Sequence, residues 1–317
     1  MQTTISIIDV GTNTFHILII RLQAGRNFHI LHKERIPVKL GEKGISKGII
    51  DDTAFDRGIE TLKYFKNISD KFNVSTIHAV ATSGIRSTTN GVKFVEQIKK
   101  QTGINIKVIS GEEEARLIYK GINFTLNLGK YPILIIDIGG GSVEFIIGNE
   151  EKIFWTKSYE IGAQRLLDRF HTNDPIPTEQ IAKMNEFLEE NLQELTDKIK
   201  EYGPRIIIGA SGAFETFSDI YFKEQNPSFL QSEVTETDMD YSLCEQIYNQ
   251  LISSTREERL KIPGMVEFRA DMIVVSAILV YFFLKKFKFS AIRVSNAALK
   301  EGVLAELLEE TITDMDL

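Results

Sequence analysis

The chain has 317 residues, of which 43% are hydrophobic and 26% are charged, with a net charge of −7 and a single cysteine, Cys244. This length exceeds the roughly 250–300 residues at which one hydrophobic core stops growing, so we expect two domains. The acidic balance argues against a nucleic-acid-binding protein, and one cysteine excludes a disulfide framework. The amino terminus lacks the pattern of a secretory signal, and the most apolar segment, Met272 to Leu284, is too short to span a bilayer. We therefore expect a cytoplasmic protein that binds no membrane and no nucleic acid.

Strands alternate with helices in the first half of the chain. Two apolar segments within Ile7 to Ile20 predict a β-hairpin, and helical spacing of apolar residues behind Asp51 predicts a helix over about Asp52 to Phe72. The pattern then predicts, in order, a strand over Ile77–Thr82, a helix near Gly91–Gln101, a strand over Ile106–Ser110 and a helix that begins at Gly111.

The second half repeats this plan. We expect strands over ILIID, EFIIG and KIFWTKSYEI, helices near Gly162–Phe170 and Thr178–Tyr202, strands over RIIIGAS and AIRVS, a buried helix over Met272–Leu284 and a final helix over about Ala297–Glu310. Alternating strands and helices, with a hairpin opening each half, predict an α/β fold of two domains with mixed sheets. The short crossing from Asn123 to Pro132 gives domains of residues 1–125 and 126–298.

Each half opens with the same polar turn between apolar segments. Ile7 to Ile20 reads IIDVGTNTFHILII and Ile135 to Gly148 reads IIDIGGGSVEFIIG, so Asp9 matches Asp137. Glycine lets a backbone approach a ligand closely, and N–H groups and hydroxyls can surround phosphate oxygens. The residues expected to bind phosphate are Gly11, Thr12, Asn13 and Thr14 in the first turn and Gly139, Gly140, Gly141 and Ser142 in the second.

The aspartates of these turns would repel a phosphate unless a cation lies between them. Mg²⁺ suits this position, because it prefers a few carboxylate oxygens together with waters and phosphate oxygens. One such turn alone is more typical of an ordinary hairpin, but two copies favour a ligand site. The turns do not discriminate between polyphosphate and ATP.

Five motifs, in order along the chain, carry a resemblance to a known family. They are IDVGTNT, ATSGIRSTTNG, ISGEEEARLIYKG, IDIGGGSVEF and PGMVEFRADMI. Together they resemble the exopolyphosphatase and guanosine pentaphosphate phosphatase (Ppx/GppA) family of the actin, hexokinase and Hsp70 superfamily. The resemblance implies two similar actin-like (ribonuclease H-like) domains around an interdomain cleft, with the helix of residues 299–317 packing back on the first domain.

The resemblance also assigns site residues. It implies that Glu114, the second of paired glutamates, activates water, and that Asp137 and Glu144 complete the catalytic set. Asp9, Asp137 and Glu144 are the implied ligands of Mg²⁺ or Mn²⁺, and Arg86 and Arg269 the implied phosphate-binding arginines. The neighbours of Glu114 have local explanations, because Ser110 and Glu113 fit a capping box and Glu112 is a first-turn acid.

Two segments depart from the family pattern. Gly209 to Phe217 reads GASGAFETF where many members have a Gly-Gly-Thr turn, and Val294 to Gly302 has Ala298 and Lys300 in place of the usual glycine and arginine. The chain also ends at Leu317 with no histidine after His171, so we expect the short type without the metal-dependent carboxyl-terminal domain of longer members.

The expected function is an exopolyphosphatase that releases terminal phosphate from inorganic polyphosphate, with guanosine pentaphosphate as a second candidate substrate and a homodimer as a candidate assembly. One alternative is a sensor that binds guanosine tetraphosphate or polyphosphate with little turnover. Another is an ATP-dependent kinase of the same superfamily.

Overall fold

The computed structural model describes residues 3–23, 27–226, 228 and 236–313. It comprises two compact units, which are described separately below. Unit 1 contains Met1–Phe124 and Leu299–Leu317, and unit 2 contains Thr125–Ala298. Unit 1 is therefore discontinuous in sequence, because its last segment follows the whole of unit 2.

Unit 1 is built on a five-stranded mixed sheet with the strand order β3-β2-β1-β4-β5. The strands are β1 Thr4–Val10, β2 Phe15–Leu22, β3 Phe28–Ile36, β4 Thr76–Ala81 and β5 Ile106–Val108. Strand β2 is antiparallel to both of its neighbours, β1 and β3, whereas β4 and β5 run parallel to β1. The helices are α1 Asp52–Lys71, α2 Ser83–Arg86, α3 Gly91–Thr102, α4 Gly111–Thr125 and α12 Leu299–Thr313.

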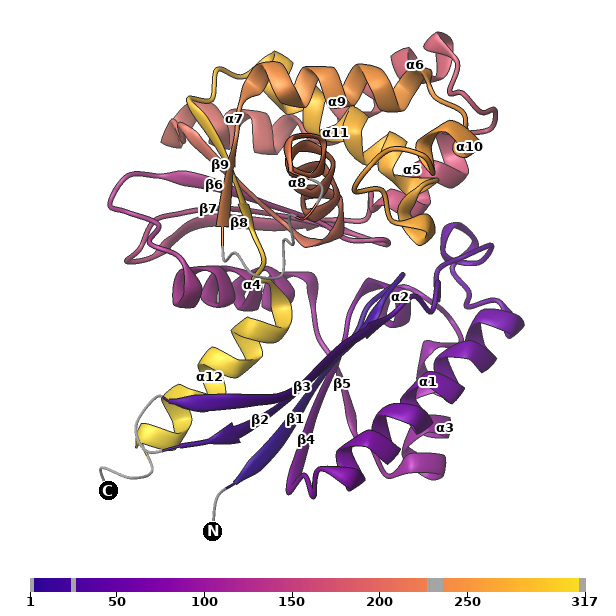
Figure 1. Ribbon diagram of the computed structural model, residues 1–317, viewed down its shortest axis with the longest axis vertical. Helices are drawn as coiled ribbons and strands as arrows, with labels where there is room; N and C mark the ends of the chain where they lie inside the picture. Colours follow the sequence, from indigo (N-terminus) through magenta and orange to yellow (C-terminus); the bar gives the residue numbers. More distant parts are fainter. Residues whose placement is uncertain (1–2, 24–26, 227, 229–235, 314–317) are drawn as a thin grey trace. The chain divides into compact units, whose positions relative to one another are not determined.

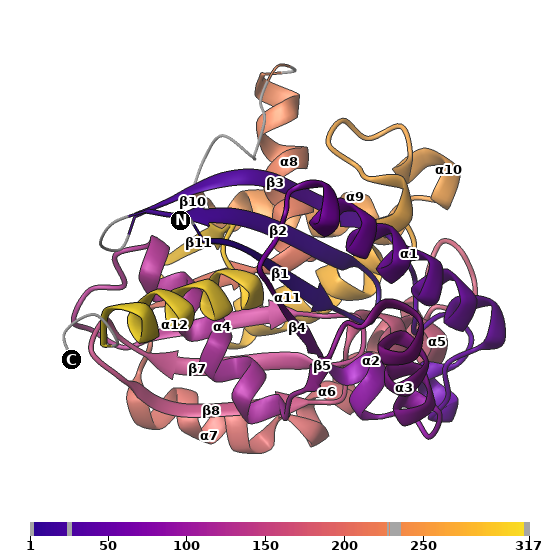
Figure 2. The same cartoon turned by 90° about the horizontal axis from the view of Figure 1, so that it is seen from below.

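The helices of unit 1 cover both faces of its sheet (Figure 1). Helices α1 and α3 pack together on one face, and α12 packs against β1 and α4 on the other (Figure 2). A Cβ atom on Gly302 of α12 would lie 1.9 Å from the carbonyl oxygen of Leu117 in α4, so the backbones of the two helices are in direct contact at this glycine. Glycine is required at this crossing because any side chain would collide with backbone.

Unit 2 contains a six-stranded mixed sheet with the order β10-β11-β9-β6-β7-β8. The strands are β6 Ile133–Ile138, β7 Val143–Gly148, β8 Ile153–Tyr159, β9 Ile206–Ala210, β10 Glu236–Met239 and β11 Ala291–Ser295. The helices are α5 Ala163–Phe170, α6 Thr178–Asn191, α7 Gln193–Tyr202, α8 Ser211–Gln225, α9 Tyr241–Ser253, α10 Arg256–Arg259 and α11 Met272–Lys286. The series β8-β7-β6-β9-β11 repeats β3-β2-β1-β4-β5 in order and direction, which confirms the predicted α/β fold of two similar domains.

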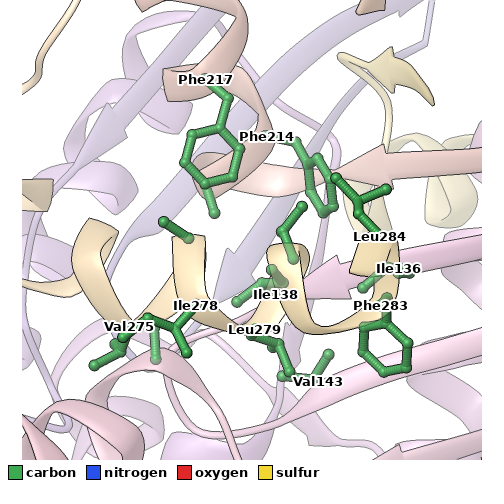
Figure 3. Packing of buried hydrophobic residues seen from close by; sticks show 14 of the residues in the cluster. Ile136, Ile138, Val143, Phe214, Phe217, Val275, Ile278, Leu279, Phe283 and Leu284 are labelled. Carbon is green, nitrogen blue, oxygen red and sulfur yellow. The ribbon is translucent and has the colours of Figure 1, made fainter. Parts of the chain in front are cut away.

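Helix α11 forms the centre of the unit 2 core. Most of its apolar segment Met272–Leu284 is buried, as predicted. Val275, Leu279 and Phe283 belong to the same buried cluster as the sheet residues Ile138 and Val143 (Figure 3). Phe283 meets Phe145 of β7 with ring centroids 5.3 Å apart. Each fully buried side chain of this size stabilises the fold by about 1.5–3 kcal/mol. In the part of the chain that the structure describes, no helix is long and apolar enough to cross a membrane.

The sequence pattern missed several local features, and two of them have a clear physical reason. The helix expected over Thr178–Tyr202 is divided at Leu192, which has φ −107° and ψ 21°. The two resulting helices bury different residues, Met184 and Leu188 in α6 and Leu195 and Ile199 in α7, so each follows its own part of the core. The edge strand β3 was also missed, because its exposed positions give it little apolar pattern.

Candidate active site

The first turn joins β1 to β2 in unit 1. Strand register places Asp9 directly opposite His16. A Cβ atom on Gly11 would lie 2.7 Å from the carbonyl oxygen of Thr14, so only glycine allows this tight closure. The turn therefore has one acid and one imidazole at the mouth of its hairpin.

A neighbouring loop holds the first turn from behind. The N–H of Lys39 donates to the carbonyl of Asn13 at 2.7 Å, and the N–H of Gly41 donates to the carbonyl of Thr12 at 2.9 Å. Gly84 of α2 also lies against Thr12, since a Cβ atom there would be 3.0 Å from its Cα. With its carbonyls engaged in this way, the turn has a fixed backbone.

The second turn joins β6 to β7 in unit 2 and closes in the same way. The N–H of Gly139 donates to the carbonyl of Ser142 at 3.1 Å, and a Cβ atom on Gly139 would lie 3.0 Å from that oxygen. Gly140, Gly141 and Ser142 are buried. Within the described residues, the N–H groups of Gly140 and Gly141 have no hydrogen-bond acceptor. Buried N–H groups are rarely left without a partner, so these two donors are suited to an anion.

The beginning of α5 supports the second turn. Gly162, Ala163 and Gln164 donate their N–H groups to the carbonyls of Gly141, Gly139 and Gly140 at 3.1, 2.9 and 2.9 Å. Arg165 adds a bond of 2.9 Å from Nε to the carbonyl of Gly141. Because the three carbonyls point towards α5, the second turn has a fixed backbone of its own.

Two buried carboxylates lie at the mouth of the second hairpin. Asp137 and Glu144 are directly opposite each other in the register of β6 and β7, and they are only 5% and 1% exposed. The hydroxyl of Ser158 donates to Glu144 Oε1 at 2.7 Å. Two like charges across a strand pair destabilise each other, and burial adds to the free-energy cost. A divalent cation would offset both effects, so the residues present fit the expected metal.

The predicted metal set includes residues of both units. Asp9 belongs to unit 1, whereas Asp137 and Glu144 belong to unit 2. Among the residues that the structure describes, no group of three or more His, Cys, Asp or Glu side chains is gathered around one point. Mg²⁺ needs few protein ligands, because waters and substrate phosphates complete its shell.

Glu114 forms an ion pair with Arg86 inside unit 1. Glu114 lies in the first turn of α4 and is 7% exposed. Arg86, the last residue of α2, donates from Nη1 to Glu114 Oε2 at 2.9 Å and to the carbonyl of Ile109 at 3.0 Å. The predicted base and the predicted phosphate-binding arginine are therefore neighbours, although 28 positions separate them in sequence.

The adjacent Glu113 has a different environment. Its N–H donates to Ser110 Oγ at 3.1 Å, which confirms Ser110 as a capping residue. Its carboxylate accepts two hydrogen bonds of 2.8 Å from Arg116. These bonds lower the pKa of Glu113 below the ordinary value of a glutamate. Glu113 is thus part of a structural ion pair, whereas Glu114 faces Arg86.

Arg269 is enclosed by the unusual GASGAFETF segment. Its Nη2 donates to Glu215 Oε2 at 3.0 Å, and its Nη1 donates to Thr216 Oγ1 at 3.0 Å. A Cβ atom on Gly212 would lie 2.6 Å from the guanidinium carbon, so the guanidinium packs directly on this glycine. The departure from the family pattern at Ala213 therefore lies in the segment that holds Arg269.

The structure thus divides the predicted residues between the units. Unit 1 contains Asp9, the first turn, Arg86 and Glu114, and unit 2 contains Asp137, Glu144, the second turn and Arg269. The sequence reasoning missed the residues that support the turns, namely Lys39, Gly41, Gly162 and Arg165. Only the isolated Gly162 after a strand gave a signal, because glycine in that place is typical of a close backbone approach.

Known proteins resemble this chain over nearly its whole length. The model of the Ppx/GppA phosphatase family matches residues 18–311. The crystal structure of an exopolyphosphatase from Cytophaga hutchinsonii is 40% identical, with a TM-score of 0.93 over 97% of this chain and 98% of that chain. A Ppx/GppA family member from Aquifex aeolicus is 25% identical, with a TM-score of 0.79 over 98% of this chain and 99% of that chain. This chain therefore belongs to the Ppx/GppA phosphatase family.

Proposed function

We propose that this protein is an exopolyphosphatase, which releases terminal phosphate from inorganic polyphosphate. The observation that carries the proposal is the ion pair of Glu114 and Arg86, a buried carboxylate and a guanidinium in the unit that also contains a phosphate-type turn. The solved exopolyphosphatase from Cytophaga hutchinsonii, which is 40% identical, supports the choice of substrate. Guanosine pentaphosphate is the second substrate of the proposal.

In the proposed reaction, Glu114 orients a water molecule and accepts its proton as the water oxygen attacks the terminal phosphorus. The bond from phosphorus to the bridging oxygen breaks, and its electron pair remains on the shortened chain. Arg86 holds the Glu114 carboxylate with Nη1, and other nitrogens of a guanidinium can bind a phosphate oxygen at the same time.

The second turn supplies N–H donors to phosphate oxygens. Asp137 and Glu144 would hold the divalent cation, Mg²⁺ or Mn²⁺, with Asp9 as the third proposed ligand, and a cation bound there would supply positive charge to offset that of the phosphate. The predicted homodimer and cytoplasmic location are part of the same proposal.

A second candidate is a sensor that binds guanosine tetraphosphate or polyphosphate with little turnover. One observation favours it: both predicted phosphate-binding arginines already have carboxylate partners, Arg86 with Glu114 and Arg269 with Glu215. Arginines that are neutralised in this way bind phosphate less strongly than unpaired ones.

Phosphate release decides between these functions. Long polyphosphate, guanosine pentaphosphate and ATP should each be incubated with the protein, with and without Mg²⁺. We expect release from polyphosphate that depends on Mg²⁺, and little release from ATP. Tight binding of polyphosphate without phosphate release would support the sensor and overturn the exopolyphosphatase.

A further inference from the structure

A loop of unit 1 carries three lysines at every fourth position. Residues 38–50, called the lysine loop below, read VKLGEKGISKGII and contain Lys39, Lys43 and Lys47. Lys43 and Lys47 are exposed and Lys39 is half-buried. Among the described residues, none of the three ammonium groups has an ion-pair or hydrogen-bond partner. In a protein with a net charge of −7, three such lysines within residues 39–47 are an unusual concentration of positive charge along the chain.

Lys43 has one weaker electrostatic neighbour. The pKa of Asp51 is lowered chiefly by hydrogen bonds from Thr53, and Lys43 makes the smallest contribution to this shift. Asp51 is the N-cap of α1 and accepts from the Thr53 N–H at 3.0 Å. The carboxylate is therefore already used by the cap, and the charge of Lys43 is left largely uncompensated.

One end of the lysine loop is attached to the first turn. The N–H groups of Lys39 and Gly41 bind the carbonyls of Asn13 and Thr12, as described above. A Cβ atom on Gly41 would lie 2.4 Å from Thr12 Cγ2, so the loop and the turn are in direct contact. The first lysine is therefore adjacent to the residues expected to bind phosphate.

The other end is attached to the segment that follows Arg86. The N–H of Thr89 donates to the carbonyl of Gly48 at 2.8 Å. The side-chain amide of Asn90 exchanges two hydrogen bonds of 2.8 Å with the backbone of Ile50. The loop thus runs from the phosphate-type turn to the chain segment beside the Arg86–Glu114 pair.

The lysine loop is also held in a fixed conformation. Arg57 of α1 donates to the carbonyls of Val38 and Lys39 at 2.8 and 3.1 Å and to Glu42 Oε2 at 3.1 Å. Lys39 and Lys43 have φ values of 51° and 61°, in the left-handed region that glycine adopts most easily. Lysine at these positions strains the backbone, and such strain is typical of functional segments.

We propose that Lys39, Lys43 and Lys47 bind the phosphates of a polyphosphate chain beyond those at the first turn, so that the lysine loop is a subsite for long substrates. This inference rests on the proposed function. Lysine is suited to this task, because a mobile ammonium group can follow a linear polyanion without a fixed geometry. Arg165, the basic residue that supports the second turn in unit 2, does not offer a charge of this kind, because it forms an ion pair with Glu160 at 2.9 Å.

The test replaces the three lysines with glutamine, which removes charge but keeps most of the side-chain length. The variant is K39Q/K43Q/K47Q, and its matched control is K71Q/K99Q/K100Q, which changes the net charge equally at exposed lysines of α1 and α3 in the same unit. Activity is measured on long polyphosphate and on tripolyphosphate over a range of KCl concentrations. The unfolding temperature is measured to show that both variants are folded.

We expect the KM for long polyphosphate to rise about tenfold in the loop variant, with kcat nearly unchanged. The slope of log KM against log salt should fall by about 2–3, because fewer counterions are exchanged for lysines. The KM for tripolyphosphate should change less than about twofold, and K39R/K43R/K47R should restore most of the lost affinity. Equal KM values for loop variant and control on long polyphosphate would overturn the subsite.

A binding experiment separates this inference from the proposed function. Fluorescently labelled long polyphosphate is titrated with wild-type protein and with the loop and control variants. If the wild type releases no phosphate from any substrate, the exopolyphosphatase is wrong, and weaker binding by the loop variant alone still supports the subsite. If all three proteins bind equally, the subsite is wrong whatever the activity.

Discussion

The two turns share one backbone design but differ in their chemistry. Both hairpins close with the same contact, from Gly11 to Thr14 in unit 1 and from Gly139 to Ser142 in unit 2. The position opposite the aspartate is His16 in unit 1 and Glu144 in unit 2. Unit 2 therefore concentrates two acids at its turn, whereas unit 1 carries its acid–arginine pair on two helices. The two units thus offer similar scaffolds, and the different residues beside each turn suit them to different tasks.

Replacement of the proposed base in unit 1 should have the largest effect on activity. We expect Glu114→Gln to lower phosphate release by about 10²–10⁴-fold, because it removes a proton acceptor and little volume. Binding of polyphosphate should remain. The control is Glu113→Gln, whose carboxylate is bound by Arg116 and should matter far less to activity. The assignment would be reversed if Glu113→Gln were the more damaging change.

The acids of unit 2 should act through the metal. We expect Asp137→Asn and Glu144→Gln each to raise the Mg²⁺ concentration for half-maximal activity by about 10–100-fold, since each removes a hard anionic oxygen. The measurement is a titration of activity with Mg²⁺. His16→Gln is the matched change in unit 1 and should leave the Mg²⁺ dependence near that of the wild type. Wild-type Mg²⁺ dependence in both acid variants would contradict the metal assignment.

The supports of the turns should also differ. A Cβ atom on Gly162 would lie 2.4 Å from backbone carbons of Gly140 and Gly141, whereas one on Gly41 would first meet a methyl group of Thr12. A backbone cannot move aside as a side chain can, so Gly162→Ala should destabilise the protein by about 1–3 kcal/mol and Gly41→Ala by less. Urea unfolding measures the loss of stability in both variants. A larger loss for Gly41→Ala than for Gly162→Ala would show that the backbone of the second turn can shift to accommodate a methyl group.

The smallest expected effect concerns the contact between α4 and α12 in unit 1. Burial opposes ionisation of Glu306, but hydrogen bonds from Arg116 and Lys120 lower its pKa. Glu306→Gln should therefore cost about 1 kcal/mol at pH 7, since the pairs are partly exposed. The more exposed Glu309→Gln is the control and should cost less.

The pH dependence of this effect has a defined sign. An acid with a lowered folded-state pKa stabilises the protein above its unfolded-state pKa of about 4.3, and this contribution is lost as the pH falls through the folded-state value. The difference in unfolding free energy between wild type and Glu306→Gln should thus be complete at pH 7 and shrink below about pH 4. A difference that did not change with pH would rule out the ion pairs as its source.

Local patterns predicted much of the fold because they act over a few residues. The Asp51 cap of α1, the apolar α11 and the two turns are visible in short stretches of sequence. The contacts that complete the candidate site are long-range, such as Arg269 with Glu215. No local pattern determines which distant carboxylate an arginine meets, and the break at Leu192 depends on the core that the two helices share.

The position of α12 at the end of the sequence affects the order in which the two units can fold during synthesis. Unit 1 requires α12 against β1 and against Leu117, yet these residues are synthesised after all of unit 2. At roughly 5–20 residues per second, a ribosome needs on the order of ten seconds or more to make the intervening segment. During that time the apolar surface reserved for α12 is uncovered, while unit 2 is continuous and can complete its core. The second half of this protein is therefore expected to complete its fold before the first.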